Sequence, residues 1–269
     1  IGLCAIADAA KEMGYHNAIS NASDIYSANS FQPPMTIGTV QASPLTMANV
    51  YATMGANGVE CTPIAITKVT DRSGSKVKVP SANCHQAIDP DIAQTVSYAL
   101  NQGVVQPGGE ASTTQLDNNR KTFAKTGTNE NTVMTTAGFV PNQVAAFVAV
   151  ADAQDPINNT FDNKTINGVY RPSWYGMYIA TPAWKQFMNT YLAAINAPID
   201  NDYGKGADKY TVSKGATRTY NQYQYQRQQN SQQQSQQQSQ QQGQQQTNQG
   251  QQQQSQQQPA EQQSDQQHQ

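Results

Sequence analysis

Residues 121–152 read KTFAKTGTNENTVMTTAGFVPNQVAAFVAVAD, and this stretch decides the fold. Runs of β-branched, aromatic and small apolar residues predict strands at 121–128, 133–140 and 144–152. The dipeptide Pro141-Asn142 separates the last two and is typical of a tight turn. Because the connections are this short, we expect neighbouring strands to run antiparallel.

Helical patterns surround these strands. A helix is predicted at residues 1–14, with Gly14 as its C-cap, and residues 15–42 are expected to form a loop. Ser43 and Pro44 then suit the N-cap and first position of a second helix, which Asn57-Gly58 ends.

Two further helices are predicted. Asp89-Pro90 opens one that ends near Gly103, and its inward residues are expected to be Ile92, Val96, Ala99 and Leu100. After an Asn-rich loop at 153–172 comes a helix at 182–194. Its expected core residues are Trp184, Phe187, Met188, Tyr191 and Leu192. The fold class is therefore α+β, an antiparallel sheet with packed helices.

The composition changes sharply near Tyr220, because residues 222–269 are almost entirely Gln, Ser and Asn. Such a segment cannot bury enough apolar surface to offset about 1–2 kcal/mol per residue of backbone entropy. We therefore expect one folded domain at 1–200 and a disordered Gln-rich tail at 201–269.

The bulk composition excludes several classes of partner. The net charge is −2 with 13% charged residues and no stripe of Lys and Arg, so we expect no nucleic-acid partner. The apolar stretches are shorter than the roughly 18 residues that cross a bilayer. A first residue of Ile rather than Met leads us to expect that the sequence starts within a longer protein.

Two of the three cysteines, Cys61 and Cys84, bracket a predicted β-hairpin with a turn at residues 71–74. If Asp71 faces Gly74, the two cysteines also face each other, and cross-strand Cβ atoms lie near disulfide reach. We favour a disulfide, which argues for an oxidising compartment, over two buried free thiols. Cys4 is expected to be a core residue of the first helix.

The motif Lys125-Thr126-Gly127-Thr128 carries the most chemical information. An ammonium and a hydroxyl on one face of a strand suit a carboxylate, and a glycine between such groups allows close backbone approach. An edge strand can also pair with an extended peptide. A surface lysine beside a turn glycine is the alternative reading of the tetrapeptide alone.

The wider sequence resembles the second half of the transpeptidase domain of class A (bifunctional) penicillin-binding proteins. The resemblance covers residues 1–190, and its most specific block is the segment GTVQASPLTMANVYATMGANGVECTPIAITKVTDRSG. The segments KTGTNEN, GFVPNQVAAFVAVAD and TPAWKQFM follow in the family's order. The cysteines around the hairpin resemble the actinobacterial branch. This implies part of the fold shared by serine β-lactamases and D,D-transpeptidases.

The resemblance implies roles for the motif. Lys125 and Thr126 would hold the terminal carboxylate of a D-Ala-D-Ala stem peptide or of a β-lactam, with Gly127 allowing close approach. The Thr128 backbone N–H would form half of the oxyanion hole. The family's Ser-x-x-Lys and Ser-x-Asn motifs are expected to lie upstream, so the nucleophilic serine is absent and this chain alone is expected to be inactive.

Other matches to catalytic motifs are predicted to be coincidental. Ser73-Gly-Ser-Lys76 falls in a hairpin turn, whereas Ser-x-x-Lys must open a helix. The matches beginning at Ser81 and Ser27 are likewise assigned to chance. His16 and His85 are isolated, so no metal site and no cofactor are expected. Thr135-Thr136 stands where the family commonly has a tryptophan, which leaves the packing there open.

The resemblance implies that the intact parent cross-links peptidoglycan by serine acyl transfer, as a transpeptidase or carboxypeptidase. It would be extracytoplasmic, held by an N-terminal membrane anchor outside this chain, with a glycosyltransferase domain upstream. A serine β-lactamase-like hydrolase and a non-catalytic cell-wall binding module are the alternatives.

Overall fold

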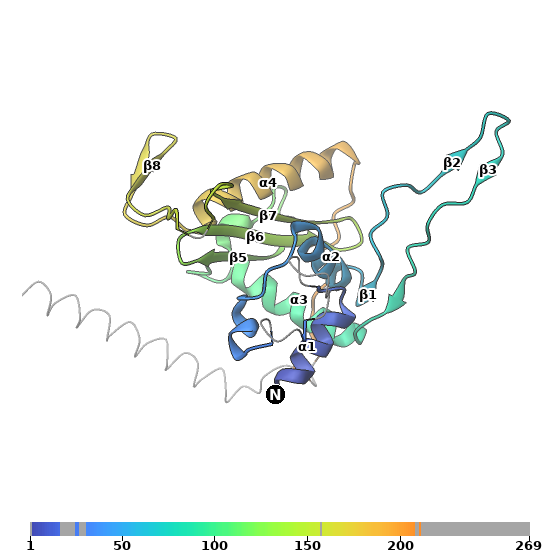
Figure 1. The fold of residues 1–269 in the computed structure, drawn as a ribbon, viewed down its shortest axis with the longest axis horizontal. Helices are drawn as coiled ribbons and strands as arrows, with labels where there is room; N and C mark the ends of the chain where they lie inside the picture. Colours follow the sequence, from blue (N-terminus) through green and yellow to red (C-terminus); the bar gives the residue numbers. More distant parts are fainter. Residues whose placement is uncertain (1, 17–24, 27–30, 157, 208–209, 211–269) are drawn as a thin grey trace, which may run out of the picture. The chain divides into compact units, whose positions relative to one another are not determined.

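The computed structural model describes residues 2–16, 25–26, 31–156, 158–207 and 210. These residues belong to one compact unit, Ile1–Thr211 (Figure 1). The Gln-rich stretch from residue 222 lies outside the described residues, as does Ser27. Within the described ranges, no helix is long and apolar enough to pass through a bilayer.

The helices in chain order are α1 Leu3–Glu12, η1 Pro33–Ile37, α2 Pro44–Gly55, α3 Pro90–Val105, η2 Ser112–Thr114 and α4 Gly176–Ala194. The strands are β1 Val59–Glu60, β2 Val69–Thr70, β3 Lys76–Val77, β4 His85–Gln86, β5 Phe123–Asn129, β6 Val133–Val140, β7 Val144–Ala151, β8 Lys164–Ile166 and β9 Val169–Arg171.

The central sheet has the order β5-β6-β7 and is antiparallel throughout, which confirms the three predicted strands. Phe123 lies opposite Phe139, and Val140 lies opposite Val144 across the tight turn. Asn142 in that turn has φ 54°, a backbone conformation that asparagine tolerates well.

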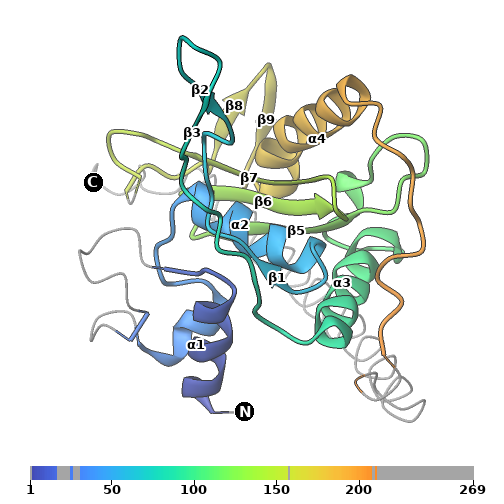
Figure 2. The same cartoon turned by 90° about the vertical axis from the view of Figure 1, so that its right-hand side faces the viewer.

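Each face of this sheet is covered by helices. On one face Phe123 and Phe139 stack with ring centroids 5.0 Å apart, in a core that includes Val50 and Met54 of α2. On the other face Ala124 packs with Trp184 of α4. Figures 1 and 2 show α4 on one side of the sheet and α3 on the other.

Helix α2 begins where the sequence predicts. The Thr46 backbone N–H donates to Ser43 Oγ at 3.1 Å, and Pro44 is the first helical residue. The helix ends before Asn57 and Gly58, which both have positive φ.

Helix α1 also lies where expected, but Cys4 is exposed rather than in the core. The buried residue of α1 is Ala7.

The buried face of α3 differs from the expected one. Ile92 and Val96 are 38% and 39% exposed, and Ala99 is exposed too, while Leu100 is half-buried against the core. The buried residues are instead Ala93, Ser97, Asn101 and Val104. Small side chains let the helix approach β5, and the buried Asn101 amide donates to the Thr122 carbonyl at 2.9 Å.

Helix α4 begins six residues before the expected start and carries Pro182 inside it. Trp184, Met188 and Leu192 are buried, as predicted. Phe187 and Tyr191, which were expected inside, are 48% and 39% exposed and stack on each other. They form the neighbouring stripe of the helix, and only one stripe can face a flat sheet.

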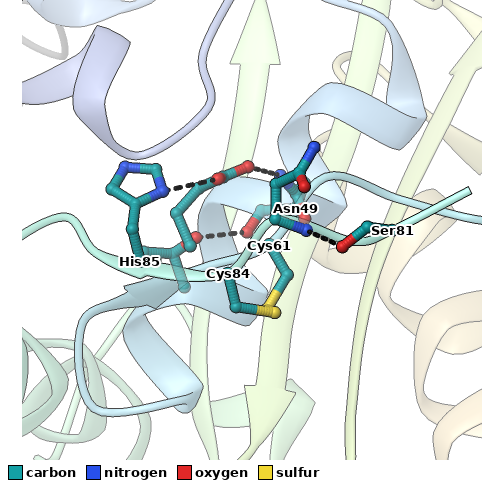
Figure 3. Close-up of a disulfide and its surroundings, with 8 residues drawn as sticks. Asn49, Cys61, Ser81, Cys84 and His85 are labelled. Carbon is teal, nitrogen blue, oxygen red and sulfur yellow. Dashed lines mark hydrogen bonds and ion pairs between the residues drawn. A yellow bond between two sulfur atoms is a disulfide. The ribbon is translucent and has the colours of Figure 1, made fainter.

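Residues 61–84 form a two-stranded projection, called here the arm, and the Cys61–Cys84 disulfide closes its base (Figure 3). The pairing was correctly predicted. The expected strand at 64–70 is reduced to β2, and the expected register is wrong by one residue at the turn, where Thr70 faces Lys76. The Asp71 carboxylate accepts from the backbone N–H groups of Ser73 and Ser75, which lengthens the turn.

Two features were not foreseen. The expected loop at 153–172 contains the hairpin β8–β9, whose turn is Asn167-Gly168 with positive φ at both residues. Asn-Gly is a strong hairpin signal.

The packed domain also extends past the expected boundary at residue 200, because Tyr203 is 8% exposed and stacks edge-on against Phe123.

Candidate active site

The motif Lys125-Thr126-Gly127-Thr128 lies in β5, the outer strand of the central sheet. One edge of β5 pairs with β6, and its other edge has no strand partner within the described residues. An outer strand offers its free backbone N–H and C=O groups to another extended chain. The structure therefore places the motif where a peptide could lie alongside it.

Lys125 and Thr126 are on opposite faces of the strand, which corrects the expectation of a shared face. Thr126 lies opposite Thr136, whose hydroxyl is 2.8 Å from that of Thr181 in α4. Thr126 is therefore on the α4 side, and Lys125 shares the other side with Phe123, because strand side chains alternate. The buried Thr136–Thr181 contact also shows how the chain packs where the family commonly has tryptophan.

The ammonium of Lys125 is accessible to solvent, since its side chain is 56% exposed. It donates to the Thr126 carbonyl at 2.7 Å and lies 3.6 Å from a carboxylate oxygen of Glu110. Glu110 comes from the loop between α3 and η2 and is itself 82% exposed. No feature of the sequence pointed to Glu110.

Gly127 is required by its neighbour across the strand pair. It lies opposite Thr135, and a Cβ at Gly127 would meet Thr135 Oγ1 at 2.3 Å. No side chain therefore projects from residue 127 on the face of β5 that carries Lys125. A peptide backbone that packs closely against β5 would need the same absence of a side chain.

The start of α4 holds the far end of the motif. The Gly176 backbone N–H donates to Thr128 Oγ1 at 3.1 Å. A Cβ at Gly176 would lie 2.4 Å from the Gly127 carbonyl oxygen, so the helix can approach only because residue 176 is glycine. Sequence reasoning missed Gly176 because it began this helix at residue 182. The glycine beside Tyr175 was the available signal.

The coincidental motif matches lie elsewhere. Ser73 is in the turn of the arm, where its hydroxyl donates to Asp71 Oδ1 at 2.6 Å, and it opens no helix. Lys76 follows it in β3. Ser81 Oγ accepts from the backbone N–H of Asn83 in a local turn (Figure 3).

The two histidines in the described part of the chain have protein partners. His16 Nε2 is 2.9 Å from Thr46 Oγ1. His85 Nδ1 lies 3.5 Å from the carboxylate of the buried Glu60, which also accepts from Asn49 (Figure 3). No group of three or more metal-ligating side chains occurs among the described residues.

Comparison with known proteins gives a consistent picture. The model of the penicillin binding protein transpeptidase domain matches residues 2–188. Penicillin-binding protein 1A of Neisseria gonorrhoeae is 30% identical over 167 residues, which cover 59% of this chain and 19% of the relative. Penicillin-binding protein 1A of Mycolicibacterium smegmatis is 27% identical over 168 residues, covering 59% of this chain and 20% of the relative. The chain thus spans about a fifth of the length of these relatives.

Solved structures share the fold. PonA1 of Mycobacterium tuberculosis in complex with penicillin V superposes with a TM-score of 0.62 at 21% identity, covering 76% of this chain and 53% of that one. Penicillin-binding protein 1A of Haemophilus influenzae gives a TM-score of 0.57 at 20% identity, covering 74% and 32%. The expected mixture of helices and antiparallel sheet is thereby confirmed as the fold of these two solved structures.

Proposed function

Because this chain belongs to the penicillin binding protein transpeptidase family, we propose that it provides the substrate-binding edge of a peptidoglycan D,D-transpeptidase. The observation that carries this proposal is the position of Lys125-Thr126-Gly127-Thr128 on a strand with one open edge. The ligand would be the D-Ala-D-Ala end of a stem peptide, or a β-lactam that resembles it.

In the proposed reaction the hydroxyl of a serine attacks the carbonyl carbon of the penultimate D-Ala. The peptide bond breaks, the proton passes to the nitrogen of the leaving terminal D-Ala, and an acyl ester remains on the serine. The amine of a second stem then attacks the ester and regenerates the serine. Water in place of that amine gives the carboxypeptidase reaction.

This chain would hold the substrate rather than attack it. The Lys125 ammonium and the Thr126 hydroxyl would bind the terminal carboxylate, and a carboxylate lying along the strand edge can reach groups on both faces. The Thr128 backbone N–H would donate to the developing oxyanion. The contact between Thr128 and Gly176 supports this role because it fixes the end of the strand.

The nucleophile would come from residues outside this chain. Neither of the two Ser-x-x-Lys matches, at Ser73 and Ser75, opens a helix that would bring its lysine one turn beyond the serine, because both lie in the turn of the arm just before β3. In the parent we propose an upstream glycosyltransferase domain and an N-terminal membrane anchor, with this domain extracytoplasmic. The disulfide Cys61–Cys84 supports an oxidising compartment.

Acylation of the intact parent by a fluorescent penicillin tests the proposal. Lys125→Ala should lower the second-order acylation rate by roughly 10–100-fold, because a charge-assisted hydrogen bond contributes about 1.5–3 kcal/mol. Thr126→Val should lose less, and Thr126→Ser should be nearly neutral because it keeps the hydroxyl. Lys164→Ala, at another exposed lysine, is the matched control.

Two outcomes would overturn the proposal. The first is an unchanged acylation rate in folded Lys125→Ala protein. The second is covalent labelling of this chain alone, which would mean that it carries its own activated serine. Rapid release of hydrolysed penicillin by the parent would instead favour a β-lactamase-like hydrolase.

A further inference from the structure

The arm carries an unbalanced set of charges. Lys68, Arg72, Lys76 and Lys78 are all exposed, and Asp71 is the single acid in residues 61–84. Asp71 is already used by the turn, where its carboxylate accepts from Ser73 and Ser75, and these hydrogen bonds lower its pKa. None of the four cations has an ion-pair partner among the described residues.

The arm also has an open edge. Strand β3 pairs with β2, and no further strand joins either of them within the described part of the chain. Figures 1 and 2 show β2 and β3 extending away from the central sheet. An isolated two-stranded hairpin is only marginally stable in water, and here the disulfide ties its two strands together at the base.

Cations and apolar side chains alternate along this edge. In β3, Lys76 and Val77 point to opposite faces, as successive strand residues do, and Lys78 and Val79 repeat the alternation in sequence just beyond the strand. Val77 faces Val69 across the pair, and they are 46% and 37% exposed. The arm thus presents a basic face and an uncovered valine face.

Lysines on an edge strand often have no role beyond preventing aggregation. That role needs charge but no exposed valine pair beside it, and an uncovered apolar pair works against it. A lipid surface fits poorly, because the tip of the arm, residues 71–75, is entirely polar. Single-stranded nucleic acid fits poorly too, since the arm has no aromatic ring on which a base could stack.

We propose that the open edge of β3 binds an extended acidic segment of a partner protein, in which Asp or Glu alternates with apolar residues. An added strand repeats side chains on one face every two residues, about 6.6 Å apart. Its carboxylates would then lie beside Lys76 and Lys78, while an apolar residue covers Val77, the valine of the strand that it joins. Pro80 has no backbone N–H and so limits the pairing in that direction.

The test titrates the oxidised chain with a labelled eight-residue peptide that alternates Glu and Val, followed by fluorescence anisotropy. A peptide of the same composition with four Glu followed by four Val is the first control. A copy N-methylated at every second residue, which cannot donate along one edge, is the second. We expect the alternating peptide to bind at least about tenfold more tightly than either control.

Charge variants of the chain complete the test. Lys76→Glu/Lys78→Glu should weaken binding of the alternating peptide by about tenfold or more. Lys11→Glu/Lys164→Glu changes the net charge equally at two other exposed lysines and should leave the affinity unchanged. Lys76→Gln/Lys78→Gln, which introduces no repulsion, should give an intermediate loss.

Three results would overturn the proposal. They are no binding of the alternating peptide, equal binding of the block or N-methylated peptide, and an affinity insensitive to Lys76 and Lys78. Binding of inorganic polyphosphate as tight as that of the alternating peptide would show a general polyanion site instead. None of these results depends on the catalytic role proposed for β5.

Discussion

The Lys125 ammonium and the Glu110 carboxylate lie 3.6 Å apart at the open edge of β5. A carboxylate of the protein thus occupies the side of the lysine where we propose that a substrate carboxylate binds. Both side chains are largely exposed, so the pair is weak and easily exchanged. Glu110 is therefore expected to compete with the ligand.

Glu110→Gln should raise the rate at which β-lactams acylate the intact parent. The expected gain is about two- to fivefold, because exposed ion pairs contribute roughly 0.2–1 kcal/mol. Glu130→Gln, an exposed acid at the other end of β5 without an ion pair among the described residues, is the matched control. A slower rate in Glu110→Gln would show that the pair positions Lys125 for binding.

Two glycine substitutions should have opposite effects. Gly176→Ala places a Cβ 2.4 Å from the Gly127 carbonyl oxygen, so it should lower the melting temperature and slow acylation of the parent. Gly103→Ala, inside α3, meets only the Ala111 Cβ at 3.9 Å and should stabilise by about 0.5–1 kcal/mol. Thermal unfolding of both variants checks this, and an unshifted melting temperature in Gly176→Ala would contradict the packing described for α4.

Two adjacent residues of α4 should respond very differently to truncation. Met188 is fully buried, so Met188→Ala should cost about 2–5 kcal/mol of unfolding free energy. Phe187 is 48% exposed, and Phe187→Ala should change stability by about 0.5 kcal/mol or less. Urea unfolding monitored by circular dichroism gives both values. A comparable loss in the two variants would mean that Phe187 is covered in solution.

The free energy of unfolding should fall at alkaline pH through Tyr51. Burial raises its pKa from 10.0 to about 12, so between these values the folded protein keeps a proton that the unfolded chain loses. The contribution of protonated Tyr51 to the free energy of unfolding is therefore fully present below pH 10. It decreases as pH rises toward 12, by on the order of 2 kcal/mol. Urea unfolding at several pH values checks this. Tyr51→Phe should reduce the dependence.

Thiol chemistry should distinguish the three cysteines. Cys4 is exposed, so a maleimide should modify the native, oxidised protein at one site. Cys61 and Cys84 are joined and should react only after reduction, when three thiols are found. Three reactive thiols in unreduced, denatured protein from an oxidising compartment would refute the pairing.

Local sequence signals correctly predicted much of the framework. The three strands of the central sheet and the start of α2 at Ser43 follow from patterns that act within a few residues. Turn chemistry and helix capping are interactions of this short range. The Cys61–Cys84 pairing could also be predicted, because the register at the base of the arm, where Glu60 faces His85, is the expected one, and the one-residue shift appears only at β2 and β3.

The sequence by itself therefore determined the three central strands, the four α-helices around them, the family and the strand that carries Lys125. The tertiary structure decided which stripe of each helix is buried, because that depends on the partner surface: Ala93 rather than Ile92 is buried in α3, and Met188 rather than Phe187 meets the sheet. It also decided which distant residues reach the motif. Glu110 and Gly176 lie beside β5 only because α3 and α4 pack on opposite faces of one sheet, a relation that no local pattern encodes.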